Sequence, residues 1–209
     1  MRPEDGTASG ALNAVVIAAG EGRRLRPLTE CWPKPLLPLE GRPVIASLLR
    51  ELSASGLMRV FVVTGHLAEQ VEELVGDGAA YGVDVTYVRQ PRADGSADAV
   101  RRAVEGGADP PLIISGADKL YAPGTVGEFA AAFADSSAPA ALAIEPDGSP
   151  TPLWGLTEAV TARLGDLPGP PYELLDAVND LEIAEIQIGK ARDLTDPLDL
   201  VKANFPYLR

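Results

Sequence analysis

Two glycines followed by closely spaced cations form the first part of the sequence that could carry out chemistry. Gly20 and Gly22 follow a short apolar run, and Arg23 and Arg24 come directly after them. Glycine lets the backbone turn sharply and approach a ligand closely, and the free N–H groups of such a turn attract anions. Further along, Lys34 stands between two prolines, whose rings fix the neighbouring φ angles. A glycine turn followed by fixed cations is suited to a polyphosphate.

Two common phosphate-binding motifs do not describe this stretch. A P-loop would have lysine and then serine or threonine after Gly22, and a dinucleotide fingerprint would have a third glycine at Leu25. Residues 18–39 instead resemble the signature of the sugar-1-phosphate nucleotidyltransferases, A-A-G-x-G-T-R-L-x-P-L-T followed by P-K-P-L-L-P. The departure is Arg23, where that family usually has threonine.

The resemblance implies roles for the residues of this stretch. Arg24 and Lys34 are the implied catalytic residues, since an arginine can hold phosphate oxygens bidentately and a lysine supplies a point charge. The backbone of the glycine turn would wrap the nucleotide. The implied nucleotide-binding residues of this turn are Ala18, Ala19, Gly20 and Gly22.

A second segment, QPRADGSAD at residues 90–98, resembles the family's Q-P-x-x-x-G-T-A-D-A. It implies that Gln90, Gly95 and Ser96 also bind the nucleotide, with Gln90 contacting the base. A glutamine amide offers one donor group and one acceptor, as a uracil or thymine edge requires. On this basis UTP or dTTP is the favoured nucleotide.

Asp118 and Asp193 are the implied ligands of one Mg²⁺ ion. Asp118 ends the sequence Gly-Ala-Asp after an apolar run, whereas the family usually has its aspartate directly after glycine. Asp193 lies in ARDLTDPLDL (191–200), which resembles W-x-D-I-G-T-P-x-D-L without its tryptophan and its Gly-Thr pair. A carboxylate next to a buried strand is costly without a partner, and Mg²⁺ typically takes one or two carboxylates plus phosphate oxygens.

The half of the family pattern that binds the acceptor matches less well. YELLDAV (172–178) resembles the family's E-L-T-D-A-I near the sugar pocket, which makes Glu173 an implied substrate-binding residue. Relatives usually carry an E-K-P segment whose glutamate and lysine hold the sugar and its phosphate. Here only Glu145 and a proline remain, and Lys190 or Lys119 is the candidate for the missing lysine. The expected substrate-binding residues are Glu173, Glu145 and Lys190.

The elements that must position these residues alternate between strands and helices. Such alternation favours an α/β fold around a mostly parallel sheet, with ligands beyond the carboxyl ends of the strands. The resemblance implies a three-layer αβα domain with a mixed sheet, as in nucleotide-diphospho-sugar transferases. Asp196 is expected to cap a last helix that starts at Pro197. The predicted strands are 14–18, 59–64, 83–88, 112–115, 140–144 and 183–188, and the predicted helices are 67–75, 97–104, 125–134, 154–164 and 172–181, with another opening at 42.

The domain organisation is expected to be simple. Residues 1–11 are predicted to form a disordered arm, and 12–209 a single domain with a shortened acceptor-binding region near 145–180. The net charge of -12 argues against binding to nucleic acid or to an anionic membrane. Cys31 is the only cysteine, which excludes an intrachain disulfide and favours the cytoplasm. No apolar run approaches transmembrane length.

Taken together, the resemblance implies a Mg²⁺-dependent enzyme that joins a nucleoside triphosphate to a sugar 1-phosphate, giving a nucleotide sugar and pyrophosphate. Two alternatives remain open. One keeps the chemistry on a non-hexose phosphate, such as a muramic, cyclitol or phosphocholine-like compound. The other is a nucleotide-binding relative without catalytic activity. The oligomeric state is left open, with a homodimer as one option.

Overall fold

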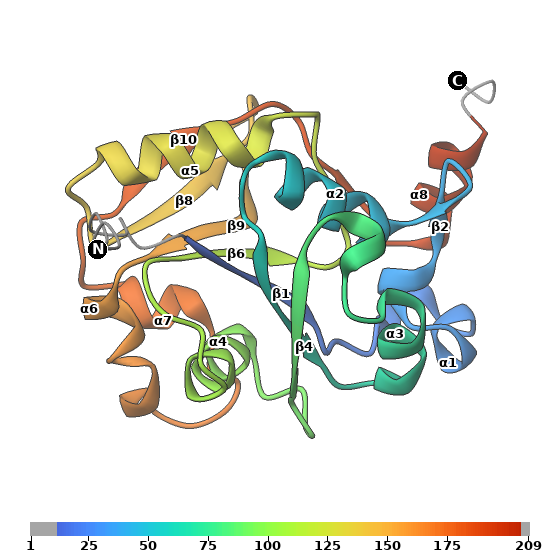
Figure 1. The fold of residues 1–209 in the computed structure, drawn as a ribbon, viewed down its shortest axis with the longest axis horizontal. Helices are drawn as coiled ribbons and strands as arrows, with labels where there is room; N and C mark the ends of the chain where they lie inside the picture. The colour runs from blue at the N-terminus through green and yellow to red at the C-terminus, as the bar shows by residue number, and fades with distance from the viewer. Residues whose placement is uncertain (1–11, 206–209) are drawn as a thin grey trace, which may run out of the picture.

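A seven-stranded sheet forms the centre of the structure, a computed structural model that describes residues 12–205 (Figure 1). The strand order is β10-β8-β9-β6-β1-β4-β5. All neighbouring pairs are parallel except the two made by β9, which confirms the predicted mixed, mostly parallel sheet. The predicted arm, 1–11, lies outside the described residues. The strands of the sheet are β1 (Asn13–Ala18), β4 (Arg59–Thr64), β5 (Asp84–Arg89), β6 (Leu112–Gly116), β8 (Ala140–Ile144), β9 (Pro150–Leu156) and β10 (Ala184–Gln187).

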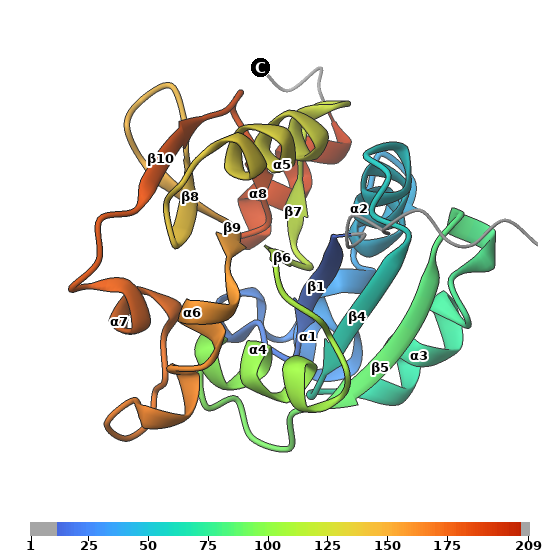
Figure 2. The same cartoon turned by 60° about the vertical axis from the view of Figure 1, so that its left-hand side comes forward.

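Helices cover both faces of this sheet (Figure 2). On β1, Val16 packs in the cluster that contains α2, α3 and α5, and its neighbour Val15 packs in the cluster that contains α4, α6 and α7. Because successive side chains of a strand point to opposite faces, a strand buried on both sides reads as a continuous apolar run. The helices are α1 (Leu28–Cys31), α2 (Val44–Ala54), α3 (Ala68–Val75), α4 (Ser96–Glu105), α5 (Thr125–Asp135), α6 (Glu158–Thr161), α7 (Leu174–Val178) and α8 (Pro197–Asn204).

The segment 154–164, which was predicted as a helix, is mostly not helical in the structure. Its first residues belong to strand β9, which lies antiparallel between β6 and β8, and only Glu158–Thr161 is helical. Leu153 and Trp154 are buried on opposite faces of the sheet, so β9 carries an apolar run rather than an alternating pattern. A continuous apolar run has no alternation, so its pattern alone does not distinguish a buried strand from a buried helix.

Two short ribbons lie outside the central sheet. β7 (Lys119–Leu120) pairs antiparallel with β11 (Arg192–Asp193), and β2 (Pro38–Leu39) pairs with β3 (Arg42–Pro43). The predicted helix opening at residue 42 therefore begins two residues later. The predicted cap of α8 is present, since the Asp196 side chain accepts hydrogen bonds from the first turn of that helix.

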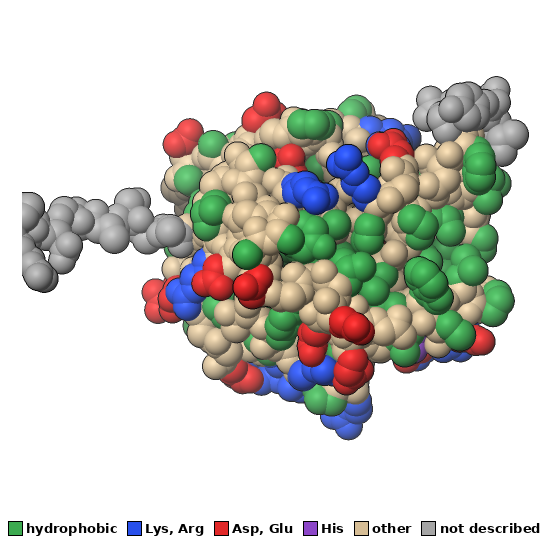
Figure 3. Space-filling model, turned by 45° about the vertical axis from the view of Figure 1, so that its right-hand side comes forward, with side chains coloured by type: hydrophobic (Ala, Val, Ile, Leu, Met, Phe, Trp, Pro, Cys, Tyr) green, Lys and Arg blue, Asp and Glu red, His purple; other side chains and the backbone are tan. Residues whose placement is uncertain are grey.

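The surface mixes charges of both signs. On the face shown in Figure 3, Lys and Arg side chains occur in small groups, many of them next to Asp and Glu. Within residues 12–205, no helix has the length and apolar character needed to cross a membrane.

Candidate active site

A cavity of about 680 Å³ lies at the carboxyl ends of β1 and β6. The glycine turn after β1 forms one side of it, and the segment after β6 lies next to that turn. The start of α4, the start of α7 and strand β9 complete the lining. Parallel strands commonly place ligand sites beyond their carboxyl ends, as the sequence predicted for this fold.

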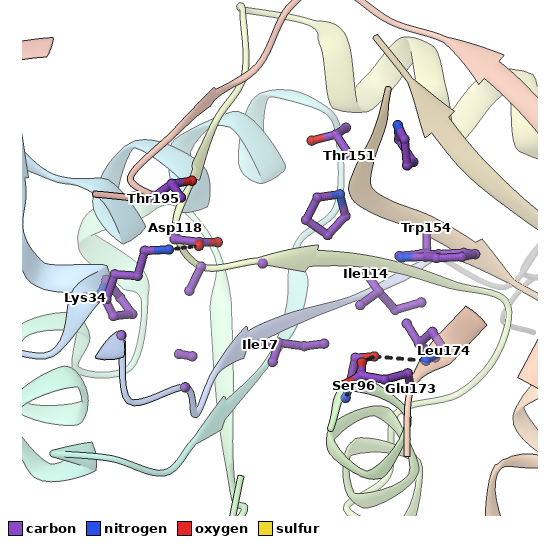
Figure 4. A pocket seen from close by; sticks show the side chains of 18 of the residues that line it. Ile17, Lys34, Ser96, Ile114, Asp118, Thr151, Trp154, Glu173, Leu174 and Thr195 are labelled. Atoms are coloured by element: carbon purple, nitrogen blue, oxygen red, sulfur yellow. Dashed lines mark hydrogen bonds and ion pairs between the residues drawn. The ribbon is translucent and has the colours of Figure 1, made fainter. Parts of the chain in front are cut away.

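Lys34 and Asp118 line one end of the cavity (Figure 4), and two further charged side chains lie against this pair. The Lys34 ammonium forms an ion pair with the Asp118 carboxylate, and its Nζ lies 3.6 Å from Asp193 Oδ1. Lys119 Nζ lies 3.0 Å from Asp193 Oδ2, which also accepts a hydrogen bond of 2.8 Å from the Thr195 hydroxyl. We call Lys34, Asp118, Lys119 and Asp193 the charge cluster. The structure thus brings together two carboxylates that lie far apart in the sequence.

The environment of Asp193 keeps it ionised. Burial alone would raise the pKa of its carboxyl, but the hydrogen bond and charge of Lys119 and the charge of Lys34 hold that pKa below its usual value. Asp193 Oδ1 is buried and has no hydrogen-bond partner among the described residues. An ionised, buried oxygen that has a lysine nearby but accepts no hydrogen bond is a suitable ligand for a cation.

The donor set fits Mg²⁺ better than a metal held by protein alone. Among residues 12–205, no group of three or more His, Cys, Asp or Glu side chains could hold a metal ion. Asp118 and Asp193 would therefore supply two carboxylate oxygens, and Mg²⁺ usually completes its shell with phosphate oxygens and water. Their role as metal ligands stays a prediction that the geometry fits.

The glycine turn is held in a tight conformation. Gly22 has φ 62°, and a Cβ at this position would lie 2.9 Å from Thr29 Cγ2. The Thr29 hydroxyl donates to the Gly22 carbonyl at 2.9 Å, which fixes the turn from α1. The two arginines that follow differ, since Arg23 pairs with Glu21 at 2.9 Å, whereas Arg24 has no ion-pair partner within residues 12–205. Arg24 lines the cavity with its charge available to an anion.

The predicted nucleotide-binding residues divide into two groups. Ala18, Gly20, Gly22 and Ser96 line the cavity, whereas Ala19, Gln90 and Gly95 are not among its lining residues.

Gln90 is buried, and its Nε2 donates to the Gly95 carbonyl at 3.0 Å and to Asp98 Oδ2 at 2.9 Å. Its amide nitrogen therefore holds the loop before α4, and its predicted contact with the base stays a prediction.

Asp98 is a residue that the sequence reasoning did not single out. Its buried carboxylate accepts hydrogen bonds from Gln90, Arg101 and Arg102. Burial alone would raise its pKa, but these bonds, led by the one from Arg102, hold the pKa below its usual value. Asp98 stands three residues before Arg101 and four residues before Arg102, a spacing that brings ion-pair partners together on one helix face. This spacing is the sequence signal that could have identified Asp98.

The predicted substrate-binding residues also divide. Glu173 lines the cavity, where its Oε2 accepts a 2.5 Å hydrogen bond from the Ser96 hydroxyl, which in turn accepts from the Leu174 N–H. These bonds join the starts of α4 and α7. The structure does not place Glu145 or Lys190 among the lining residues, because they follow β8 and β10 at the far edge of the sheet.

The wall opposite the glycine turn was not predicted. It consists of Ile114 on β6, Leu142 on β8, and Thr151 and Trp154 on β9, which we call the apolar wall. The expectation of a helix at 154–164 hid the strand that brings Trp154 to the cavity.

Comparison with known proteins agrees with this arrangement. The model of the family described as nucleotidyl transferase matches residues 13–160. An N-acetylmuramate alpha-1-phosphate uridylyltransferase of Neisseria meningitidis serogroup B is 41% identical over 80 residues, which are 38% of this chain and 35% of that protein. A glucose-1-phosphate thymidylyltransferase of Streptomyces antibioticus is 40% identical over 89 residues, 43% of this chain and 25% of that protein. The chain thus spans about a third or less of these relatives.

The fold is similar to that of solved structures. A putative glucose-1-phosphate thymidylyltransferase from Bacillus anthracis, in complex with a sucrose, superposes with a TM-score of 0.83 at 19% identity and covers 93% of this chain and 94% of that one. At this identity the likeness shows the shared fold. Since the family model covers well over half of the sequence, the chain belongs to the nucleotidyl transferase family.

Proposed function

We propose that this chain transfers a nucleotidyl group from a nucleoside triphosphate, UTP or dTTP being favoured, to a sugar 1-phosphate or a related phosphorylated acceptor. The observation that carries the proposal is the charge cluster, in which Lys34 lies between Asp118 and Asp193 beside the glycine turn. Family membership and the curated relatives' names support the same chemistry.

The reaction needs positioning and charge neutralisation more than covalent participation by the protein. An oxygen of the acceptor phosphate attacks the α-phosphorus, the bond between that phosphorus and the bridging oxygen to the β-phosphate breaks, and pyrophosphate leaves. In the proposed site Arg24 and Lys34 hold the negative charge that spreads over the phosphate oxygens. The N–H groups of the glycine turn bind the remaining phosphates. The acceptor phosphate is already ionised at neutral pH, so the attack requires no protein base.

The proposed cofactor is Mg²⁺, held by Asp118 and Asp193. When bound, this ion supplies further positive charge to the triphosphate and the departing pyrophosphate. The chain's own part is to hold the two carboxylates close together, which Lys34 supports by lying between them and Lys119 supports through its ion pair with Asp193. Thr195 orients the Asp193 carboxylate through its hydroxyl.

The test is a matrix of five nucleoside triphosphates against a panel of sugar phosphates, read by release of pyrophosphate in the presence of Mg²⁺. Asp118→Asn and Asp193→Asn should each abolish turnover while the fold persists by circular dichroism. A matched control is Asp135→Asn, which makes the same change at the exposed end of α5. If nucleotide binds but no pair releases pyrophosphate, the chain is a non-catalytic nucleotide-binding relative and the proposal is wrong.

The remaining features of the proposal concern the whole chain. Residues 12–209 are proposed to act as one domain, with the shortened acceptor-binding region near 145–180. The exposed thiol of Cys31 supports a reducing compartment such as the cytoplasm. The proposed partners are the triphosphate and the acceptor, without nucleic acid or membrane, and size-exclusion chromatography with light scattering would decide between a monomer and a homodimer.

A further inference from the structure

The two ends of the cavity differ in chemistry (Figure 4). One end holds Lys34 and Asp118, with Arg24 on the glycine turn. At the other end lies the apolar wall, flanked by two prolines of β9 and by Leu174 of α7. No charged side chain belongs to this wall. A phosphorylated ligand that places its phosphate at the charge cluster would lay the rest of its body along the wall.

Thr151 is the single polar member of the wall. It is 2% exposed, and its Oγ1 has no hydrogen-bond partner within residues 12–205. In Figure 4 Thr151 lies along the edge of the cavity between Asp118 and Trp154. Nearly all buried hydroxyls in proteins have a partner, because an unmade bond is costly. A hydroxyl that lines a cavity and lacks a partner is suited to one polar group of a ligand.

On the other side of this end, the Ser96 hydroxyl is already engaged. The Ser96 hydroxyl donates to Glu173 and accepts from the Leu174 N–H. The two residues expected to bind an acceptor sugar from further along the chain, Glu145 and Lys190, are not lining residues. The wall therefore offers a sugar one hydrogen bond, whereas a hexose carries hydroxyls around its ring, and burying them without partners is unfavourable.

On the basis of the proposed function, we propose that the apolar wall binds the body of the acceptor, and that the accepted class is a phosphate or phosphonate poor in hydroxyl groups on the side that meets the wall. A deoxy or alkyl body fulfils this condition, because it brings neither a charge nor further hydroxyl groups to the wall. Thr151 is the specificity-determining residue, since it donates or accepts the only hydrogen bond that the wall provides. Trp154 gives the body an aromatic surface on which to pack.

The first experiment compares acceptors with many and with few hydroxyl groups and with no cationic group. Pyrophosphate release is measured with UTP or dTTP, Mg²⁺ and either glucose 1-phosphate, its 6-deoxy analogue or propylphosphonate. At least one hydroxyl-poor acceptor should exceed glucose 1-phosphate in kcat/KM by about tenfold to a hundredfold, the range for discrimination by an apolar pocket.

The second experiment removes the Thr151 hydroxyl and keeps the side-chain shape. Thr151→Val should raise KM for the best acceptor about threefold to tenfold, leave KM for the nucleotide unchanged, and leave Tm unchanged or higher because the hydroxyl has no partner to lose. The matched control is Thr161→Val, whose hydroxyl donates to the Glu158 carbonyl outside the cavity. This control should lower Tm and leave both KM values unchanged.

Binding gives a readout that does not depend on turnover. Trp32 is 58% exposed and does not line the cavity, so Trp32→Phe leaves Trp154 as the only tryptophan. Its fluorescence should change on titration with the preferred acceptor in the presence of nucleotide, and less so with glucose 1-phosphate.

The outcomes separate the inference from the proposed function. A preference for glucose 1-phosphate over every hydroxyl-poor acceptor, or an unchanged acceptor KM in Thr151→Val, overturns the inference and leaves the proposed function in place. Absence of pyrophosphate release with every pair overturns both. The expected ranking together with the Thr151→Val shift supports both.

Discussion

Replacing Lys34 by methionine should separate two effects of this lysine on the charge cluster. In the structure the Lys34 ammonium is paired with Asp118 and lies 3.6 Å from Asp193. A divalent cation that binds these carboxylates must therefore compete with an ammonium already present. In the Lys34→Met variant, Mg²⁺ should bind the nucleotide-free protein more tightly, while nucleotidyl transfer should nearly cease. The two effects have opposite signs, so general damage to the site cannot produce both.

The magnitude follows from the geometry. Two unit charges 3.6 Å apart attract by about 4–5 kcal/mol at an effective dielectric constant of ~20. The side chains of Lys34, Asp118 and Asp193 are 14%, 24% and 31% exposed, so water screens part of this attraction. Keeping about a third of it gives ~1.4 kcal/mol, or about tenfold in the dissociation constant for Mg²⁺. Loss of the positive charge at the reacting phosphate should lower kcat by about 100-fold to 1,000-fold.

Isothermal titration of Mg²⁺ into nucleotide-free protein measures the first effect, and pyrophosphate release measures the second. Titrations in two buffers with different ionisation enthalpies separate the heat of Mg²⁺ binding from the heat of any proton exchange with the buffer. Lys202→Met, on an exposed position of α8, is the matched control and should change neither value. Equal or weaker Mg²⁺ binding by a folded Lys34→Met protein would show that the lysine does not compete for these carboxylates, and the reasoning would be wrong.

Three further predictions concern the loops around the cavity. Asp98→Asn should lower the free energy of unfolding by about 2–3 kcal/mol at pH 7, since it removes the buried carboxylate that pairs with Arg102 and shares Arg101 with Glu105. Burial alone would raise the pKa of Asp98, but its hydrogen bonds hold that pKa low. The stabilisation from this carboxylate is therefore complete above pH ~4 and is lost in more acid solution. In urea unfolding, the free-energy difference between the wild-type protein and Asp98→Asn should be smaller at pH 3 than at pH 7. Gly95→Ala should lower the free energy of unfolding by about 2–4 kcal/mol in thermal unfolding, because φ is 108° and the new Cβ would lie 2.3 Å from a backbone oxygen. The control Gly107→Ala also has a positive φ, 99°, but lies in open space and should cost only ~1 kcal/mol. Arg24→Lys should lower kcat about tenfold to a hundredfold through loss of bidentate contact, whereas Arg23→Lys should change it less than about threefold; equal losses in steady-state assays would contradict the assigned roles.

The sequence predicted the parallel half of the sheet because each strand there has a local signature. Residues 14–18 in β1 and 60–63 in β4 are continuous apolar runs, so they read as strands covered on both faces. β9 has no such signature. Its apolar run matches a helix as well as a strand, and only its pairing with β6 and β8 decides between them. That pairing is a long-range property, and the apolar wall depends on it.

The site shows the same division between local and long-range information. The glycine turn and Lys34 lie within one continuous stretch, so their proximity was predictable from residue spacing. The role of Lys190 as a substitute for the missing lysine stays a prediction, since Lys190 follows the edge strand β10 and is not among the lining residues of the cavity. Lys119, the other candidate, lies in the charge cluster instead. Lys119 lies opposite Asp193 because β7 and β11 pair with each other, which the spacing of residues in the sequence does not reveal.

The position of Asp193 depends on the residue that follows it. β11 has only two residues, so its pairing with β7 gives the register little support of its own. Leu194 is fully buried in a small cluster with Leu25, Leu37, Leu39 and Val44. A slip of one residue would move this leucine out of the cluster and turn Asp193 away from the cavity, since alternate side chains point to opposite faces. Leu25 directly follows Arg24, so the same apolar cluster anchors the segments that carry Arg24 and Asp193. Hydrophobic burial beneath the site thus fixes the spacing between its positive and negative charges.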